Sequence, residues 1–367
     1  MDNYEVLTKS ESNKLSKAIL ETIRKNLNDT KAGIEAVKDL IAKNPKVGRL
    51  DLKKTVITDK GMVILNGALR MNKTINSVDL SRNQLSKESM EGFAEAIIIK
   101  QAILKYSLNL NNLGDEGIRL FANGVKEIKR LKEIQLNCVG LTDAGIQPLG
   151  EAIVGKLFLT KLDLSSNAIT AEGAKILGPC LKGIASIEEF KISFNPIKDE
   201  GVTAICEGLE GDKALKLLSM VKCEIGAEGG LSLLKMLENK ESMEEIYLRE
   251  NLFETEFGVQ LAEVLKKFPK ISKVDLRQNS LEDEAGKALV GAMNEKDYVT
   301  ELDLRNNHIG EEATILFEQL KQQQPFLWIE YNKYVPTEEE LKLREEKRIA
   351  KEKEAKKALK AQPKKKK

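Results

Sequence analysis

Side chains that could perform catalysis are scarce in this sequence and lack the partners that catalysis requires. The only histidine is His308, and no serine or cysteine has a histidine in a triad-like arrangement. The sequence contains no G-x-x-x-x-G-K-[ST] loop, no H-E-x-x-H pair and no G-x-G-x-x-G following an expected strand. We therefore expect no enzyme activity, no catalytic residue, no metal site and no cofactor.

Acidic residues recur in a regular pattern that raises the possibility of carboxylate chemistry. They follow an apolar residue and precede another at five places: Asp51, Asp79, Asp163, Asp275 and Asp303. Two carboxylates near one another can act as general acid and base. Because the alternation of apolar and acidic residues is also ordinary for a half-buried strand, we interpret these aspartates as strand residues and not as catalysts.

The four cysteines indicate the cellular compartment. Cys138, Cys180, Cys206 and Cys223 are far apart and have no C-x-x-C spacing, which fits buried thiols in a reducing environment better than a disulfide framework or a zinc site. The sequence has no signal-peptide pattern and no apolar run long enough to cross a bilayer. We expect a cytoplasmic protein that does not insert into membranes.

The elements that position these side chains follow from an internal repeat of 28 residues. Residues 159–169 spell L-x-x-L-x-L-x-x-N-x-I. The same template begins at Val47, Ile75, Ile103, Leu131, Leu159, Ile187, Leu215, Met243, Ile271 and Val299. Ten units in unbroken register predict a solenoid in which each unit buries its core only by stacking on its neighbours.

Each repeat is expected to contain one strand, one turn and one helix. Positions four and six point into the core, so positions three, five and seven face the opposite side of the sheet. Position nine is asparagine in seven repeats, and its amide can bond to turn backbone groups shielded from water. Val139 cannot do this, which predicts an altered turn in the fourth repeat. Positions 19 and 23 are apolar, which indicates a helix, and Phe257 is expected to distort the eighth repeat at position fifteen, where glycine is usual.

Four segments follow from these patterns. We predict a helical N-terminal cap over residues 1–46, ten repeats over 47–326, a C-terminal capping strand within 327–336, and a charged helix with a basic tail over 337–367. The last segment has thirteen Lys or Arg and seven Glu, a net charge of +6, whereas the remainder carries −4. It is either a solvated tail or an electrostatic contact, made through Lys364, Lys365, Lys366 and Lys367, with an acidic surface such as tubulin tails, nucleic acid or an anionic membrane.

The template and its length resemble those of the ribonuclease-inhibitor-like leucine-rich repeats over residues 47 to about 331. The resemblance implies an α/β solenoid, a horseshoe with parallel strands on the concave face and helices on the convex face. It also implies a protein partner on the concave face or the turn rims. The family includes ribonuclease inhibitor, the Ran GTPase-activating protein, receptor sensor domains, tropomodulin-type actin regulators and axonemal proteins.

The inner face predicts where a partner binds. Arg249, Arg277 and Arg305 recur at position seven of the last three repeats, beside Asp275 and Asp303. One interpretation is that arginine and aspartate neutralise one another across strands. The other is an interface hot spot, since aromatic and arginine residues dominate binding energy. The expected partner-binding residues are Phe194, Leu217, Val221, Tyr247, Arg249, Arg277 and Arg305, with the apolar members exposed.

These observations favour a non-enzymatic scaffold for protein–protein interaction, with nucleic acid not expected as the partner of the concave face. A structural role in the cytoskeleton or the ciliary axoneme is the preferred setting, on the strength of the family resemblance and the basic tail. The alternative is an activator of a small GTPase resembling the Ran activator, in which turn residues such as Arg82 or Asn83 would touch the partner.

Overall fold

The computed structural model describes residues 2–294, 301–323, 327–332 and 342. The chain divides into two compact units, Met1–Tyr331 and Asn332–Lys367. The charged helix and basic tail predicted for 337–367 lie outside the described residues apart from Lys342. The architecture below is that of the first unit.

Strands and helices alternate along the first unit after two N-terminal helices. The strands are β1 Arg49–Asp51, β2 Ser77–Asp79, β3 Lys105–Ser107, β4 Glu133–Gln135, β5 Lys161–Asp163, β6 Glu189–Lys191, β7 Leu217–Ser219, β8 Glu245–Tyr247, β9 Lys273–Asp275, β10 Glu301–Asp303 and β11 Trp328–Glu330. The helices are α1 Asp2–Lys25, α2 Thr30–Ala42, α3 Asp59–Leu69, α4 Lys87–Lys100, α5 Gly114–Val125, α6 Asp143–Ile153, α7 Ala171–Leu181, α8 Lys198–Leu209, α9 Ala227–Leu237, α10 Thr255–Lys266, α11 Asp283–Asn294 and α12 Glu311–Gln323.

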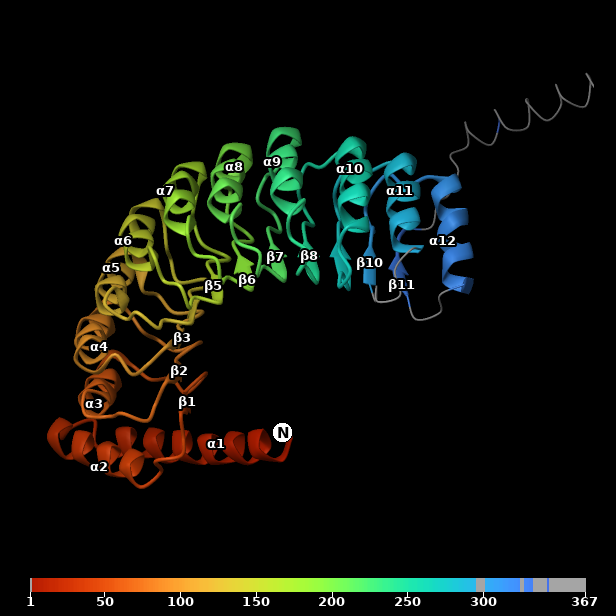
Figure 1. The fold of residues 1–367 in the computed structure, drawn as a ribbon. Coiled ribbons are helices and arrows are strands. Elements are labelled where there is room, and N and C mark those ends of the chain that lie inside the picture. The colour runs from red at the N-terminus through yellow and green to blue at the C-terminus, as the bar shows by residue number, and fades with distance from the viewer. Residues whose placement is uncertain (1, 295–300, 324–326, 333–341, 343–367) are drawn as a thin grey trace, which may run out of the picture. The chain divides into compact units, whose positions relative to one another are not determined.

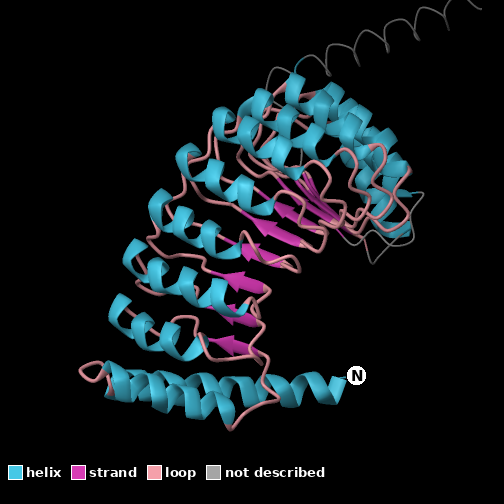
Figure 2. Ribbon diagram, turned by 60° about the vertical axis from the view of Figure 1, so that its left-hand side comes forward, coloured by secondary structure: helices cyan, strands magenta, loops and turns pink. Residues whose placement is uncertain are grey.

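The strands form one parallel sheet in sequence order, from β1 to β11. Each strand pairs with the next at an offset of 28 residues, as in Leu162 opposite Phe190, and only the β10 to β11 pair has an offset of 27. The sheet lines the inside of an arc and the helices line the outside (Figures 1 and 2). The predicted solenoid horseshoe of ten 28-residue repeats is confirmed.

The core of each repeat lies between its strand and its helix. In the fifth repeat Leu162 and Leu164 point inward from the strand, and Leu177 and Leu181 point inward from α7; all four are fully buried. Neighbouring repeats place equivalent side chains above and below them, so each repeat completes the core of the next. Stability is therefore shared along the stack.

The N-terminal helix takes the place of a strand that would precede β1. Hydroxyl groups on α1 satisfy the free edge of the sheet: Ser12 donates to the Arg49 carbonyl at 2.6 Å, and Ser16 accepts from the Asp51 N–H at 3.0 Å. Ile19 of the same helix is fully buried. A charged solvent-facing helix thus covers backbone groups that would otherwise offer an edge for association.

The position-nine asparagine joins each repeat to the one before it. The Asn167 Oδ1 accepts from the N–H groups of Val139 and Leu141, both at 3.1 Å. Its Nδ2 donates to the carbonyls of Leu136 at 2.8 Å and Leu164 at 2.9 Å. Four turn groups from two repeats are therefore satisfied by one side chain, which is the ladder that the sequence predicts.

The residue before that asparagine position turns the chain out of the sheet. Its φ lies between 52° and 59° in all ten repeats, at Lys54, Arg82, Leu110, Cys138, Ser166, Phe194, Lys222, Glu250, Gln278 and Asn306. This left-handed conformation is unfavourable for residues other than glycine. It is held by a backbone bond to the next repeat, such as the one from the Phe194 N–H to the Val221 carbonyl at 2.7 Å.

Loss of the asparagine changes the turn in two repeats at once. The predicted alteration beside Val139 is confirmed: the following Gly140 adopts a φ of 77°. The change also reaches the preceding repeat, where Gly114 donates its N–H to the Val139 carbonyl at 3.0 Å and α5 begins one residue early. Cys223 causes the same shift in α8 through Lys198. In both cases the backbone carbonyl of the residue at position nine accepts a hydrogen bond in place of the missing asparagine side-chain oxygen.

Phe257 separates two neighbouring helices, as expected. At the equivalent position a Cβ added to Gly173 would lie 2.2 Å from the Asp143 Oδ1, so glycine permits the usual close approach. Phe257 instead stacks on Phe253 with ring centroids 3.9 Å apart and packs toward Gly230. Helices α9 and α10 consequently contact one another less than other neighbouring helices, and Figure 1 shows the wider spacing.

We predict that Asn167→Ala lowers the free energy of unfolding by about 2–6 kcal/mol, because two shielded N–H groups lose their acceptor and each costs about 1–3 kcal/mol. Urea unfolding followed by circular dichroism measures the change. Asn137→Ala is the matched control, since that amide bonds only to the Ser166 hydroxyl at 3.3 Å. Equal stability of the two variants would contradict a structural role for the ladder.

Candidate functional site

The concave face has a hollow in the middle of the sheet, over strands β5 to β9. It is lined by Asn137, Asp163, Ser165, Ser166, Lys191, Ser193, Phe194, Leu217, Ser219, Val221, Glu245, Tyr247, Arg249, Asp275 and Arg277. Six of the seven side chains predicted to bind a partner are therefore brought together. Arg305 lies two repeats beyond Arg249 and outside this lining.

The hollow forms because position seven changes from short to long side chains. Ser165, Ser193 and Val221 are short and buried there, with 4–6% of their surface exposed. Arg249 and Arg277 at the same position retain 32% and 27% side-chain exposure. The expectation that Val221 is exposed was wrong, because a branched side chain of two methyl groups does not reach past its neighbours.

Phe194 and Leu217 supply the apolar part of the hollow. Phe194 is 39% exposed, and its left-handed backbone directs the side chain to the rim of the turn. Leu217 begins β7 between two glutamates, Glu189 and Glu245, and is half-buried. The two exposed apolar groups come from adjacent repeats, so a partner side chain can contact both.

Arg277 and Arg305 are committed to carboxylates of the sheet. Arg277 bonds through two nitrogens to Asp275 at 2.9 and 2.6 Å, and its Nε lies 3.1 Å from Asp303. Arg305 binds Asp303 in the same two-pronged way at 2.9 and 2.5 Å. The pKa of the Arg277 guanidinium is raised by its bonds to Asp275. Neutralisation across strands, as interpreted from the sequence, is found for Arg277 with Asp303, whereas Arg277 with Asp275 and Arg305 with Asp303 are pairs within one repeat.

Arg249 lacks such a partner because the row of aspartates at position five does not extend to its repeat. Position five of its repeat is Tyr247 where the next two repeats have aspartate. Among the described residues its ion pair is with Glu250 at 3.9 Å, and that carboxylate also lies 3.4 Å from Lys222. Arg249 is therefore the position-seven arginine of these repeats whose planar guanidinium is open to an incoming carboxylate.

Tyr247 is held as a neutral phenol at the edge of the hollow. Its hydroxyl donates to the Glu245 carboxylate at 2.5 Å, and it is half-buried. Burial and the neighbouring Glu245 charge both raise the pKa of the phenol. The ring consequently presents an uncharged aromatic surface beside Arg249, in an orientation fixed by one hydrogen bond.

Asp163 and Lys191 are the charged members of β5 and β6 among the lining residues that were not predicted as partner contacts. Asp163 accepts the Ser165 N–H at 3.0 Å, whereas Lys191 lies 3.4 Å from Glu189. Both occupy position five, in the same row of the sheet as Ser219, Tyr247 and Asp275. Their position within the repeat could have predicted that they line the hollow. Their residue types could not.

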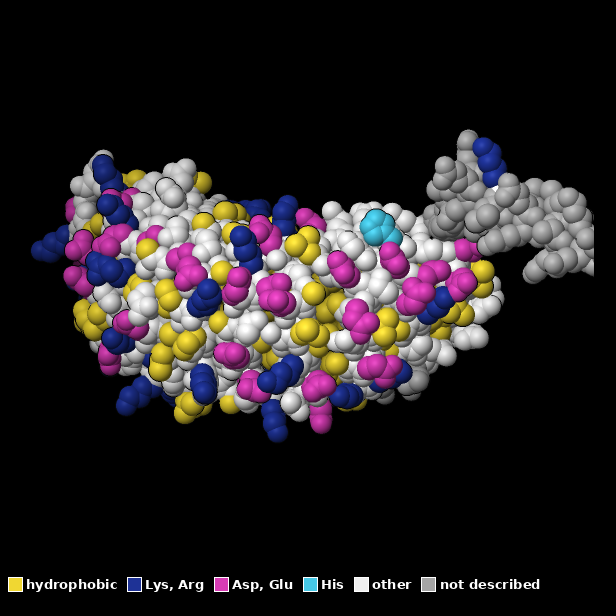
Figure 3. Space-filling model, turned by 90° about the horizontal axis from the view of Figure 1, so that it is seen from above, with side chains coloured by type: hydrophobic (Ala, Val, Ile, Leu, Met, Phe, Trp, Pro, Cys, Tyr) yellow, Lys and Arg dark blue, Asp and Glu magenta, His cyan; other side chains and the backbone are white. Residues whose placement is uncertain are grey.

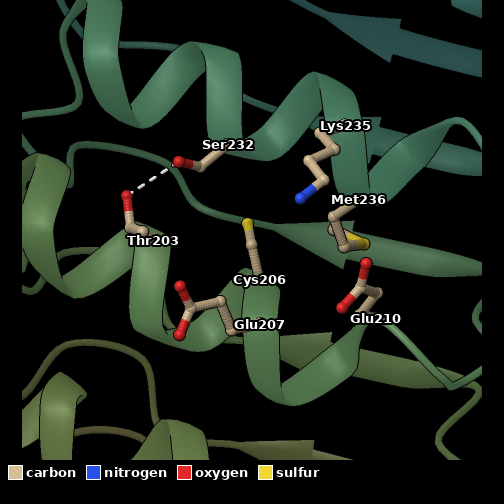
Figure 4. Close-up of a pocket in the computed structure, with 7 residues that line it drawn as sticks. All are labelled: Thr203, Cys206, Glu207, Glu210, Ser232, Lys235 and Met236. Carbon is tan, nitrogen blue, oxygen red and sulfur yellow. Dashed lines mark hydrogen bonds between the residues drawn. The ribbon is translucent and has the colours of Figure 1, made fainter.

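A second, smaller hollow lies between α8 and α9 on the outside of the arc. Figure 4 shows Cys206 at its centre, with Thr203 and Ser232 hydrogen-bonded at 2.8 Å on one side. Burial raises the pKa of the Cys206 thiol to about 12, so a reactive thiolate is not formed there. On the face seen in Figure 3 charges of both signs are interspersed, which gives no extended field of one sign.

The four cysteines are free thiols but not all are buried. Cys206 and Cys223 are buried, Cys180 is half-buried, and Cys138 is exposed. The expectation of four buried thiols was wrong for Cys138, because the left-handed turn after β4 directs its side chain to solvent.

Within the described ranges, no group of three or more His, Cys, Asp or Glu side chains is arranged to hold a metal ion. None of the described helices is both long and apolar enough to span a membrane. The lysines predicted to contact an acidic surface, Lys364, Lys365, Lys366 and Lys367, lie outside the described residues.

Comparison with known proteins identifies the repeat. A family model described as leucine-rich repeat matches residues 72–94, 156–178, 184–206 and 298–313. No curated protein matches the chain. Together with the sheet register, these matches identify the fold as a leucine-rich-repeat solenoid.

Solved structures resemble this chain at low sequence identity. A chain of the yeast Rad7 and Elc1 complex is 15% identical, with a TM-score of 0.51, over 92% of this chain and 94% of that chain. An internalin (inlF) from Listeria monocytogenes is 13% identical, with a TM-score of 0.48, over 86% of this chain and 90% of that chain. At such identities the likeness to the yeast chain concerns the fold alone.

We predict that only Cys138 reacts rapidly with Ellman's reagent in the folded protein at about pH 8, because thiolate formation and access control the rate. Burial raises the pKa of Cys206 and of Cys223 to about 12, so these thiols should react only after unfolding. Absorbance of the released thionitrobenzoate gives the number of fast sites. Cys138→Ser should remove the fast phase, and a fast phase that survives this substitution would refute the assignment.

Proposed function

We propose that this leucine-rich-repeat protein is a non-enzymatic scaffold of the ribonuclease-inhibitor-like type that binds a protein partner in the concave hollow. The observation that carries the proposal is the open guanidinium of Arg249 beside the Tyr247 ring, in a ladder whose other arginines are neutralised. The uniform 28-residue repeats with full helices on the convex side support the subtype.

The hollow combines the features that concentrate binding energy at protein interfaces. Phe194 and Leu217 offer exposed apolar surface, Tyr247 offers an aromatic face, and Arg249 offers a charged planar group. Such anchors account for most of the affinity of an interface, whereas surrounding contacts mainly exclude water. The short side chains at Ser165 and Ser193 leave room for a partner group to enter.

The anchors are also fixed in place before binding. Tyr247 is held by Glu245, and Phe194 is held by a backbone bond to the next repeat at 2.7 Å. The Tyr247 side chain therefore loses little freedom when a partner binds, which favours affinity for a given contact area. The complementary partner carries an apolar side chain and a carboxylate a short distance apart.

We propose a structural role in the cytoskeleton or the ciliary axoneme, with the C-terminal segment as a second contact. Residues 337–367 carry a net charge of +6, and the chain ends in Lys364, Lys365, Lys366 and Lys367. These charges suit an acidic surface such as tubulin tails. The resemblance to axonemal and tropomodulin-type leucine-rich-repeat proteins supports the setting.

A GTPase activator resembling the Ran activator is the alternative, and one observation bears on it. The Asn83 amide is used inside the fold, where it accepts from the Thr55 and Ile57 N–H groups, each at 3.1 Å, and donates to two carbonyls. Arg82 is exposed on the same turn. Acceleration of GTP hydrolysis that is lost in Arg82→Ala would favour this alternative.

We predict that Tyr247→Ala with Arg249→Ala releases the partner recovered by affinity purification from the native cell. Truncation of a hot-spot residue costs about 2 kcal/mol or more, roughly thirtyfold in Kd. Isothermal titration calorimetry with that partner measures the loss. Thermal stability should change little, because both side chains face away from the core.

Ser165→Ala is the matched control on the floor of the same hollow and should bind normally. Arg277→Ala provides a contrast: it leaves the buried Asp275 without its arginine and Asp303 with Arg305 alone, so it should lower stability as well as binding. Full retention of the partner by the Tyr247 and Arg249 double variant would place the interface elsewhere on the molecule.

We predict that deletion of residues 337–367 weakens binding to polyglutamate, a probe for acidic tails, and that the lost part is the salt-sensitive part. Fluorescence anisotropy in low and high salt separates the two contributions. Circular dichroism should show an intact repeat unit. Unchanged binding at low salt after the deletion would make the segment a passive solvated tail.

A further inference from the structure

Three large apolar side chains are exposed together where α6 leads into β5. Val154, Leu157 and Phe158 expose 56%, 64% and 50% of their surface. We call these three residues the 154–158 patch. They lie on the rim where helices lead into strands, the rim opposite to the turns that contribute Phe194 to the concave hollow.

The same positions of the adjacent repeats carry different residue types. Position 24 is Lys126, Val154 and Lys182 in the third to fifth repeats; position 27 is Lys129, Leu157 and Ala185; position 28 is Arg130, Phe158 and Ser186. Each apolar residue therefore stands next to a base of the third repeat. Neither core packing nor the repeat template requires apolar residues at these exposed positions.

Contacts between the loops keep the neighbouring residues close. The Thr160 N–H donates to the Lys132 carbonyl at 2.8 Å, and the Ser186 hydroxyl donates to the Leu159 carbonyl at 2.9 Å. Lys156 is 6% exposed, and its ammonium group donates to the Lys126 carbonyl across the repeat boundary. The buried lysine ties the loop that carries the patch to the loop that carries the bases.

The loop is also rigid in itself. The Lys156 N–H donates to the Ile153 carbonyl at 3.1 Å, and the Leu157 N–H donates to the Gly155 carbonyl at 3.0 Å. Gly155 has a φ of 69°, a conformation natural to glycine, which ends α6 sharply and turns the next residues outward. Leu157 and Phe158 are thus presented in a fixed arrangement.

The charges around the patch are mostly positive and open to a partner. Lys126, Lys129, Arg130 and Lys182 are exposed, and none forms an ion pair with a residue that the structure describes. The exposed acids on the third and fourth repeats are Glu116, Glu127 and Glu151, and Glu116 forms an ion pair with Arg119. A ligand with apolar groups flanked by carboxylates matches this surface, since apolar contact and charge complementarity then act together.

We propose that the 154–158 patch and its flanking bases form a second docking surface, which binds an acidic amphipathic segment of another protein. A narrow peptide can place carboxylates on Lys129 and Arg130 and still avoid Glu127 and Glu151. A broad anionic lipid surface meets both acids, and the rigid loop cannot extend into it. The surface is independent of the concave hollow and uses none of its residues.

The test measures the binding of a synthetic helical peptide that has leucine and phenylalanine on one face and glutamate on the other. The labelled peptide is titrated with the full chain by fluorescence anisotropy. Leu157→Ser with Phe158→Ser should weaken binding at least tenfold. Lys129→Glu with Arg130→Glu should weaken it similarly and remove most of its salt dependence.

Matched controls separate this surface from the rest of the molecule. Leu231→Ser removes an exposed apolar side chain of α9, 57% exposed, and should leave binding unchanged. A peptide with serine in place of leucine and phenylalanine reports binding by charge alone, including that of Lys364 to Lys367, and should bind far more weakly. The Tyr247 and Arg249 double variant should bind the amphipathic peptide normally. The test of this surface therefore does not depend on whether the concave hollow binds a partner.

Three results would overturn the proposal. The first is an amphipathic peptide that fails to bind the full chain, and the second is equal binding by the patch variants. The third is sedimentation of the chain with phosphatidylcholine–phosphatidylserine vesicles that is lost in the patch variants while peptide binding is kept. That result would assign the patch to a membrane surface.

Discussion

One asparagine amide bonded to two consecutive repeats sets the spacing of the whole molecule. Because the amide of Asn167 satisfies donors of the fourth repeat and carbonyls of both the fourth and fifth, neighbouring repeats cannot slip without leaving shielded backbone groups unpaired. The constant 28-residue register of the strands follows from this bond together with core packing. Where the amide is missing, as at Val139, the backbone carbonyl of that residue serves as the acceptor instead. Helix α5 of the preceding repeat then begins one residue early.

The constant register converts single positions of the repeat into rows on the surface. Position seven forms a row in which Ser165, Ser193 and Val221 are followed by Arg249 and Arg277, and the change in side-chain length hollows the concave face. A solenoid without fixed register would scatter these side chains. The concave hollow is therefore a consequence of stacking.

Charge neutralisation within a row decides which side chains remain open to a partner. Arg277 and Arg305 neutralise nearly buried aspartates, so their first role is to make the last part of the sheet stable. Tyr247 stands at position five, where the next two repeats have aspartate, and so leaves Arg249 without a close carboxylate. The same logic applies on the opposite rim, where the equivalents of Lys129 and Arg130 in the next repeat are the apolar Leu157 and Phe158. Both surfaces arise where a regular pattern is interrupted.

The sequence by itself determined the repeat, its register, the strand and helix of each unit and the altered turn at Val139, because these depend on local periodicity and on hydrogen-bonding groups fixed by residue type. It also placed the predicted anchors other than Phe194 on one face through a period of two. The tertiary structure decided how far each side chain reaches: it buried Val221, exposed Cys138 and committed Arg277 to Asp275 and Asp303. Exposure and ion pairing depend on the lengths of side chains in adjacent repeats, 28 residues away in the chain. They therefore emerged only when the repeats were stacked.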